Sequence, residues 1–61
     1  MTKHEFETHA WGAKDKIVIL DELPRKPYMV TAVDFEQGLV EYSYEGGYRN
    51  TPYAFCELII I

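Results

Sequence analysis

The sequence has very few of the residues that build disulfides or metal sites. Its 61 residues include one cysteine, Cys56, which excludes an internal disulfide and favours a reducing compartment. The two histidines, His4 and His9, lack the spacing of zinc-binding pairs, and no glycine-rich phosphate loop is present. We therefore expect no metal and no cofactor, and we expect Cys56 to be a small buried hydrophobe.

Long apolar runs and helical patterns are also missing. The longest unbroken apolar runs are residues 17–20 and 58–61, far below the roughly 20 residues of a membrane span. The N-terminal residues carry acids where a signal peptide needs an apolar stretch. We therefore expect a soluble, cytoplasmic protein. Because no catalytic constellation can be assembled from these residues, we do not expect an enzyme.

Basic residues are scarce in the second half of the chain. Residues 31–61 contain Arg49 against five carboxylates, and the net charge of −4 arises there. Binding to nucleic acid draws most of its affinity from Lys and Arg, so this charge disfavours it. The acidic half either keeps the protein soluble or meets a basic partner. The acid pair Asp21-Glu22 lies in a proline-containing loop and is interpreted as solvated.

The sequence does contain a series of short β patterns. Strands are predicted at residues 16–20, 28–35, 39–44, 48–50 and 58–61, separated by a proline-rich loop and two glycine turns. In the second strand, Val30 and Ala32 are placed on one face, with a bulge near residues 32–33 as the alternative. In the third, Val40, Tyr42 and Tyr44 share one face.

The order of these elements predicts a small all-β domain over residues 11–61. Thr51-Pro52 is expected to cap and begin one short helical turn before the last strand. Closure into a barrel would remove the exposed edges of such a short apolar sheet. Residues 1–10 show no sustained period, and we predict a flexible or late-docking segment there.

Several short motifs resemble those of SH3-like barrels. They are Lys14-Asp15-Lys16-Ile17-Val18, similar to the Gly-Asp-x-Val opening strand, Pro27-Tyr28-Met29-Val30, Gly38-Leu39-Val40, and Phe55 and Leu58 around the helical turn. Within that fold, the chain resembles small, functionally uncharacterised bacterial and phage proteins. The resemblance implies a five-stranded SH3-like barrel with one short helical turn before the last strand. It implies no activity.

Aromatic residues are abundant, with one Trp, five Tyr and three Phe, and a barrel this small cannot enclose all of them. Tyr and Trp are frequent interface anchors, and aromatic grooves on SH3-like barrels bind proline-rich or cationic peptides. The alternative is that these rings only cap barrel ends and form cross-strand pairs. The residues predicted to bind a partner are Trp11, Tyr28, Tyr48, Tyr53, Glu41 and Glu45.

The sequence thus predicts a non-enzymatic protein-interaction module with an aromatic and acidic surface, whose protein partner is basic or proline-rich. One alternative is a nucleic-acid-associated protein, or an acidic inhibitor of a DNA-binding protein. Another is a structural subunit that forms a homodimer through Leu58–Ile61, because a barrel interior can take only half of those apolar side chains. Their cover would be either a second copy or the N-terminal segment with Phe6 and Trp11.

Overall fold

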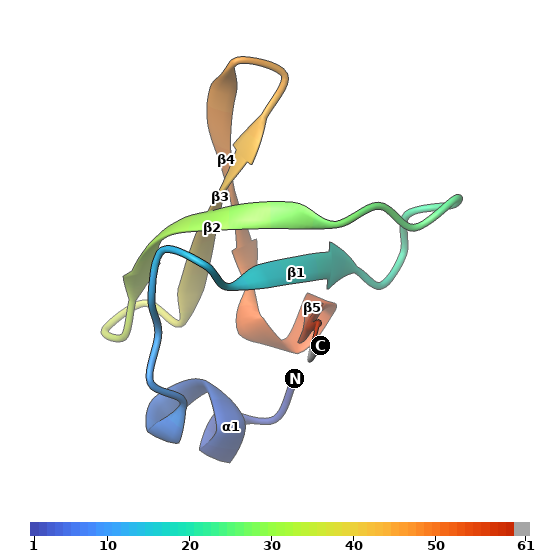
Figure 1. Ribbon diagram of the computed structural model, residues 1–61. Coiled ribbons are helices and arrows are strands. Elements are labelled where there is room, and N and C mark those ends of the chain that lie inside the picture. The colour runs from blue at the N-terminus through green and yellow to red at the C-terminus, as the bar shows by residue number, and fades with distance from the viewer. Residues whose placement is uncertain (60–61) are drawn as a thin grey trace.

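A computed structural model describes residues 1–59 of the chain. Five antiparallel strands form one open sheet in the order β4-β3-β2-β1-β5 (Figure 1). The predicted β architecture with five strands is confirmed, although β4 and β5 are the free edges of the sheet. The elements are α1 (Lys3–Thr8), β1 (Lys16–Ile19), β2 (Tyr28–Asp34), β3 (Leu39–Tyr44), β4 (Gly47–Pro52), the 3-10 helix η1 (Tyr53–Phe55) and β5 (Cys56–Leu58).

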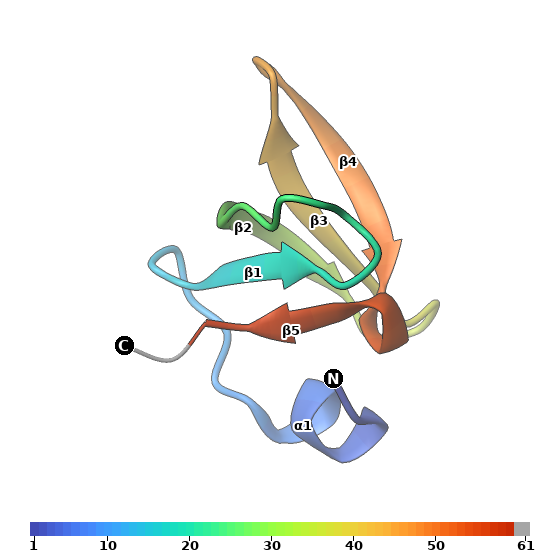
Figure 2. The same cartoon turned by 90° about the vertical axis from the view of Figure 1, so that its right-hand side faces the viewer.

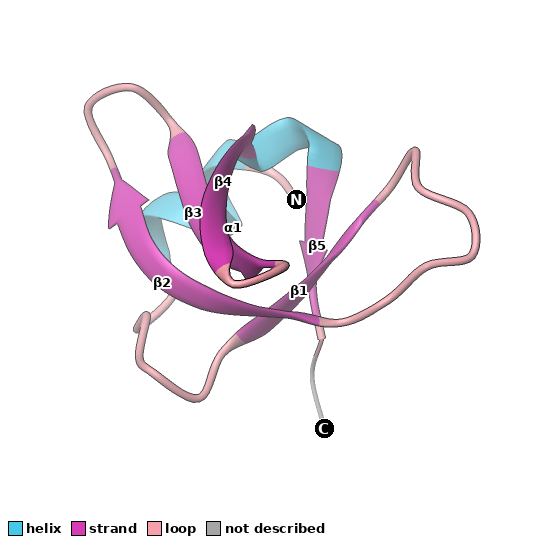
Figure 3. Cartoon of the chain, turned by 90° about the horizontal axis from the view of Figure 1, so that it is seen from above, coloured by secondary structure: helices cyan, strands magenta, loops and turns pink. Residues whose placement is uncertain are grey.

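Strand β2 joins the two halves of the sheet. Its first two residues pair with β1, and from Val30 onward it pairs with β3 (Figure 3). The register shifts between Val30 and Ala32, so Thr31 is the extra residue of a β-bulge. This bulge lies one residue before the expected position. It leaves Val30 buried and Ala32 exposed, so the assignment of these two residues to one face was wrong.

The core is small and includes residues from the N-terminal segment. Figure 2 shows α1 beneath η1 and β5, where it covers one side of the core. Phe6 of this helix is 1% exposed, and its ring stacks on Tyr53 with 4.9 Å between centroids. The buried apolar residues are Met1, Phe6, Ile17, Val30, Val40, Tyr42 and Cys56.

Helix α1 was not predicted, although residues 1–10 contain a local signal for it. Thr2 and Glu5 form a capping box, in which the Glu5 amide donates to Thr2 Oγ1 and the Thr2 amide donates to Glu5 Oε1. Six residues are too few for an isolated helix, so α1 depends on its packing. Among the described residues, none of the helices is long and apolar enough to span a membrane.

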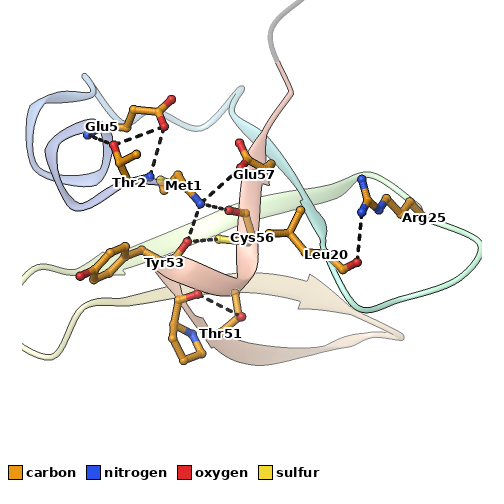
Figure 4. Close-up of polar contacts among 10 residues, drawn as sticks. Met1, Thr2, Glu5, Leu20, Arg25, Thr51, Tyr53, Cys56 and Glu57 are labelled. Atoms are coloured by element: carbon orange, nitrogen blue, oxygen red, sulfur yellow. Dashed lines mark hydrogen bonds and ion pairs between the residues drawn. The ribbon is translucent and has the colours of Figure 1, made fainter.

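The α-ammonium group of Met1 attaches this segment to the end of the sheet. It donates to the carbonyl oxygens of Tyr53, at 2.9 Å, and of Cys56, and it lies 3.7 Å from Glu57 Oε1 (Figure 4). The nitrogen is fully buried, whereas the Glu57 side chain is half exposed. The two carbonyl groups are therefore its main partners.

The first residue predicted for the helical turn was wrong, and so was the first residue predicted for the last strand. Thr51 and Pro52 are the last two residues of β4, where Thr51 pairs with Val40 and is buried. The 3-10 turn begins only at Tyr53, without a side-chain cap. Strand β5 begins two residues earlier than predicted because its register against β1 starts at Cys56. Residues 60–61 of the predicted strand lie outside the described residues.

Candidate functional site

The six residues predicted to bind a partner do not form one surface. Cross-strand partners share a face of a sheet, and Tyr48 lies opposite Ser43, which is on the same face as Glu41. We call this the outer face. Tyr28 points to the opposite face and joins other tyrosines, while Tyr53 is covered by Phe6. The remaining residue, Glu45, lies in the β3–β4 turn with a φ of 45°.

Trp11 lines an apolar groove on the described residues. The groove has a volume of about 470 Å³ and is lined by residues 11–13 and 29–33. The Val30 amide donates to the carbonyl of Asp15 at 3.0 Å, and the chain before Asp15 then leads away toward α1 (Figure 1). Strand β2 continues to Asp34, and among residues 1–59 only β3 pairs with this part of it. We call this feature the Trp11 groove.

The wall of the Trp11 groove is held by several local contacts. The indole Nε1–H of Trp11 donates to the carbonyl of Phe6 at 3.0 Å, and the ring meets His9 edge-on with 4.7 Å between centroids. His9 Nε2 lies 3.0 Å from Asp15 Oδ2, which also accepts the Gly12 amide at 2.8 Å. Trp11 is thus fixed between α1 and β1, with part of its ring left accessible.

One carboxylate borders this groove. The hydroxyl of Thr31, a residue that lines the groove, donates to Glu41 Oε1 at 2.8 Å. Tyr48 lies one strand further along the same outer face and is 71% exposed. Two of the predicted residues, Glu41 and Tyr48, therefore share the outer face, while Trp11 lines the groove beside β2.

Tyr28, Tyr42 and Tyr44 form a second aromatic group, which we call the tyrosine cluster. Their ring centroids lie 5.0, 5.8 and 6.4 Å apart. The guanidinium carbon of Arg49 lies 4.1 Å from the centroid of the Tyr44 ring. Tyr42, Tyr44 and Arg49 were not predicted as site residues, although the alternation in β3 already placed both tyrosines on one face.

Glu22 completes this group, contrary to its interpretation as solvated. The Tyr28 hydroxyl lies 2.7 and 2.6 Å from the two carboxylate oxygens of Glu22, to which it donates. This hydrogen bond is the main reason that the pKa of Tyr28 is raised to about 12. Burial is the main cause that raises the pKa of Tyr42, while the nearby charge of Arg49 lowers it.

Because of the Tyr28–Glu22 hydrogen bond, we expect Tyr28 to ionise at a higher pH than an ordinary tyrosine when the titration is followed by absorbance. The pKa of Tyr28 in the folded protein lies above the ordinary value of 10.0, so folding favours the protonated hydroxyl. Its contribution to stability is present below about pH 10 and is lost as the pH rises toward 12. The variant Glu22→Gln removes the negative charge, and we expect the pKa of Tyr28 to be lower in it than in the unaltered protein. Identical ultraviolet titration curves for both proteins would contradict this contact.

Cys56 belongs to the hydrophobic core, and Tyr53 packs against it. Tyr53 stacks on Phe6, and its carbonyl accepts from the Met1 ammonium group. Cys56 has no exposed surface, and burial raises the pKa of its thiol to about 11. The prediction that Cys56 is a small buried hydrophobe is confirmed. Within residues 1–59, no group of three or more His, Cys, Asp or Glu side chains is arranged to hold a metal ion.

Comparison with known proteins gives no relative for this chain. No family model matches it, and neither a curated protein nor a solved structure does. Function is therefore inferred from the geometry of the Trp11 groove and the tyrosine cluster.

The C-terminal apolar residues are only partly described. Leu58 pairs with Ile17 in the sheet, and Leu58 and Ile59 are partly buried. Ile60 and Ile61 lie outside the described residues. The homodimer through Leu58–Ile61 stays a prediction.

Proposed function

We propose that this protein is a non-enzymatic interaction module that binds an extended segment of a partner protein in the Trp11 groove. The observation that carries the proposal is that the groove runs along β2 where β1 no longer lies beside it. An extended segment can add to such an edge through main-chain hydrogen bonds, while side-chain pockets supply specificity. Trp11 stands at this edge, and tryptophan is one of the residues most enriched among interface hot spots.

The groove also indicates the composition of the bound segment. Its wall and floor are formed largely by Trp11, Met29, Val30 and Val33, which favour apolar side chains on one face of the segment. Glu41 borders the groove through Thr31, and the net negative charge of the chain arises in its second half. Basic residues on the segment are therefore favoured.

The proposal includes the SH3-like assignment of the fold. It is supported by the strand order, by β2 serving both halves of the sheet and by the 3-10 turn between β4 and β5. Proteins of that architecture place peptide-binding grooves beside aromatic side chains. Because β1 pairs only with Tyr28 and Met29 among the described residues of β2, the rest of that side of β2 is accessible beside Trp11.

Selection from a displayed library of random heptapeptides tests the proposed function. The selected peptides should alternate apolar residues, with Lys or Arg between them. Because Trp11 is the only tryptophan, its fluorescence reports binding to the groove directly. N-methylation of alternate amides along one edge of a selected peptide should abolish binding, and methylation of the other edge should not, because strand addition uses the amides of one edge.

Two exposed apolar residues supply matched variants for this test. Met29 lines the groove and is 53% exposed, whereas Leu23 is 87% exposed in the β1–β2 loop and does not line it. We expect Met29→Thr to weaken the selected peptides at least fivefold and Leu23→Thr to leave them unchanged. Equal affinity for both variants, or a library that yields no binder, would refute the proposal.

A further inference from the structure

The tyrosine cluster already holds a cation, and this cation belongs to the chain itself. The guanidinium carbon of Arg49 lies 4.1 Å from the centroid of the Tyr44 ring, within the roughly 6 Å over which a ring attracts a cation. Arg49 is exposed. The ion pairs among the described residues are those of Met1 with Glu57 and of His9 with Asp15, so Arg49 has no carboxylate partner there.

Two carboxylates act on the cluster besides Arg49. The carboxylate of Glu22 accepts the hydrogen bond from Tyr28, and the charges of Asp21 and Glu22 both raise the pKa of Tyr42. Both carboxylates therefore lie close enough to act on the cluster, against the single positive charge of Arg49. Aromatic faces with a carboxylate beside them form an environment that attracts cations.

We propose that the tyrosine cluster is a binding site for a cationic side chain of a partner, a guanidinium or an alkylammonium, which replaces Arg49 over the Tyr44 ring. The incoming cation keeps the contact with the ring, and the carboxylate of Glu22, which lies at the Tyr28 hydroxyl, attracts it. Arg49 can move into solvent, because it is exposed and lies on the β3–β4 hairpin, which projects beyond the rest of the sheet (Figure 1). Arg49 thus acts as a placeholder in the free protein.

This site is separate from the Trp11 groove. Tyr28 and Met29 are neighbours in β2, and successive side chains of a strand point to opposite faces. Met29 lines the groove, while Tyr28 belongs to the tyrosine cluster on the other face. The inference therefore goes beyond the proposed function, and either site can fail while the other holds.

Titration with a minimal cation and its neutral isostere tests the proposal. The probes are N-acetyl-arginine amide and N-acetyl-citrulline amide, which have similar shapes but differ in charge. Nuclear magnetic resonance is used to follow the ring signals of the three tyrosines and the side-chain Nε–H of Arg49. We expect the arginine probe to shift the Tyr44 ring signals and to move the Arg49 signal toward that of free arginine. The citrulline probe should do neither.

Three variants separate a cation site from a nonspecific effect. Arg49→Gln removes the placeholder and should tighten the arginine probe by about 2-fold to 30-fold, the range of a cation–π contact. Tyr44→Leu should weaken it by a similar factor. The control Tyr48→Leu changes an exposed tyrosine on the other face of the same hairpin and should have no effect.

Each opposite result overturns the proposal. Equal shifts from the citrulline probe would show that charge is not recognised. A dissociation constant that is unchanged or weaker in Arg49→Gln would show that Arg49 does not occupy the site. Unchanged binding in Tyr44→Leu would place the probe elsewhere. The groove variant Met29→Thr should bind the arginine probe as the unaltered protein does, so a failure of the proposed function is distinguishable from a failure of this site.

Discussion

Phe6→Ala is expected to abolish most of the stability of the domain. Phe6 is 1% exposed, and its ring contacts the rings of Tyr53, Phe35 and Trp11. Truncation of a buried phenylalanine costs about 3–5 kcal/mol, and a domain of this size has a total stability of only about 3–5 kcal/mol. Urea denaturation followed by circular dichroism measures the loss.

A matched variant distinguishes the burial of Phe6 from a general effect of removing an aromatic ring. Phe55 is 59% exposed in η1, and Phe55→Ala should cost less than about 1 kcal/mol. If Phe6→Ala is too unstable to measure, Phe6→Leu keeps much of the apolar volume and should fall between the two. Equal urea midpoints for Phe6→Ala and Phe55→Ala would show that α1 is not docked as described.

The dependence of helix α1 on the burial of Phe6 also explains why the helix was not predicted from the sequence. The helix has six residues, and Phe6 is its one buried apolar side chain, so no amphipathic period could be read. The capping box of Thr2 and Glu5 was readable, but such a box alone does not stabilise an isolated short helix. The helix exists because Phe6 reaches Tyr53, 47 positions later in the chain, and this contact has no local signature.

The strands were more accessible to sequence analysis, because alternation and glycine turns are local. The limits of β3 were predicted as observed. In β2, alternation alone does not assign the two faces correctly, because the bulge at Thr31 changes which side chains face the core after Val30. The pattern of β2 is apolar on both faces, so it allowed two registers, and only pairing with β3 selects one.

The candidate sites are formed by contacts between different segments of the chain. Such contacts leave no local pattern, so the sites were only partly predicted. Trp11 was selected from its residue type, but its groove exists only because β1 begins at Lys16, opposite Met29, and does not continue beside the rest of β2. Glu22 was interpreted as solvated because the proline loop gave no sign that it folds back onto Tyr28. The pairing of Arg49 with Tyr44 follows from the β3–β4 register, which was not assigned from the sequence.

Acetylation of the α-amino group of Met1 is expected to destabilise the 61-residue chain. The ammonium group is fully buried and donates to the carbonyls of Tyr53 and Cys56. An acetylated amide has one N–H and no charge, so at least one buried carbonyl loses its donor. Hydrogen bonds to charged groups contribute about 1.5–3 kcal/mol, and we expect a loss in this range. Thermal unfolding of two chemically synthesised chains, free and acetylated, measures it.

The sign of the change in stability on acetylation distinguishes a buried ammonium group from a solvated one. The dipole of helix α1 alone would predict that acetylation stabilises the chain. Removing a positive charge near a helix N-terminus relieves an unfavourable interaction with the helix dipole, so acetylation would stabilise α1 if the ammonium group were solvated. Glu57 lies 3.7 Å away and is half exposed, so Glu57→Gln should cost at most about 1 kcal/mol and leave the effect of acetylation in place. A higher melting temperature for the acetylated chain would show that the ammonium group does not hold the N-terminal segment against η1 and β5.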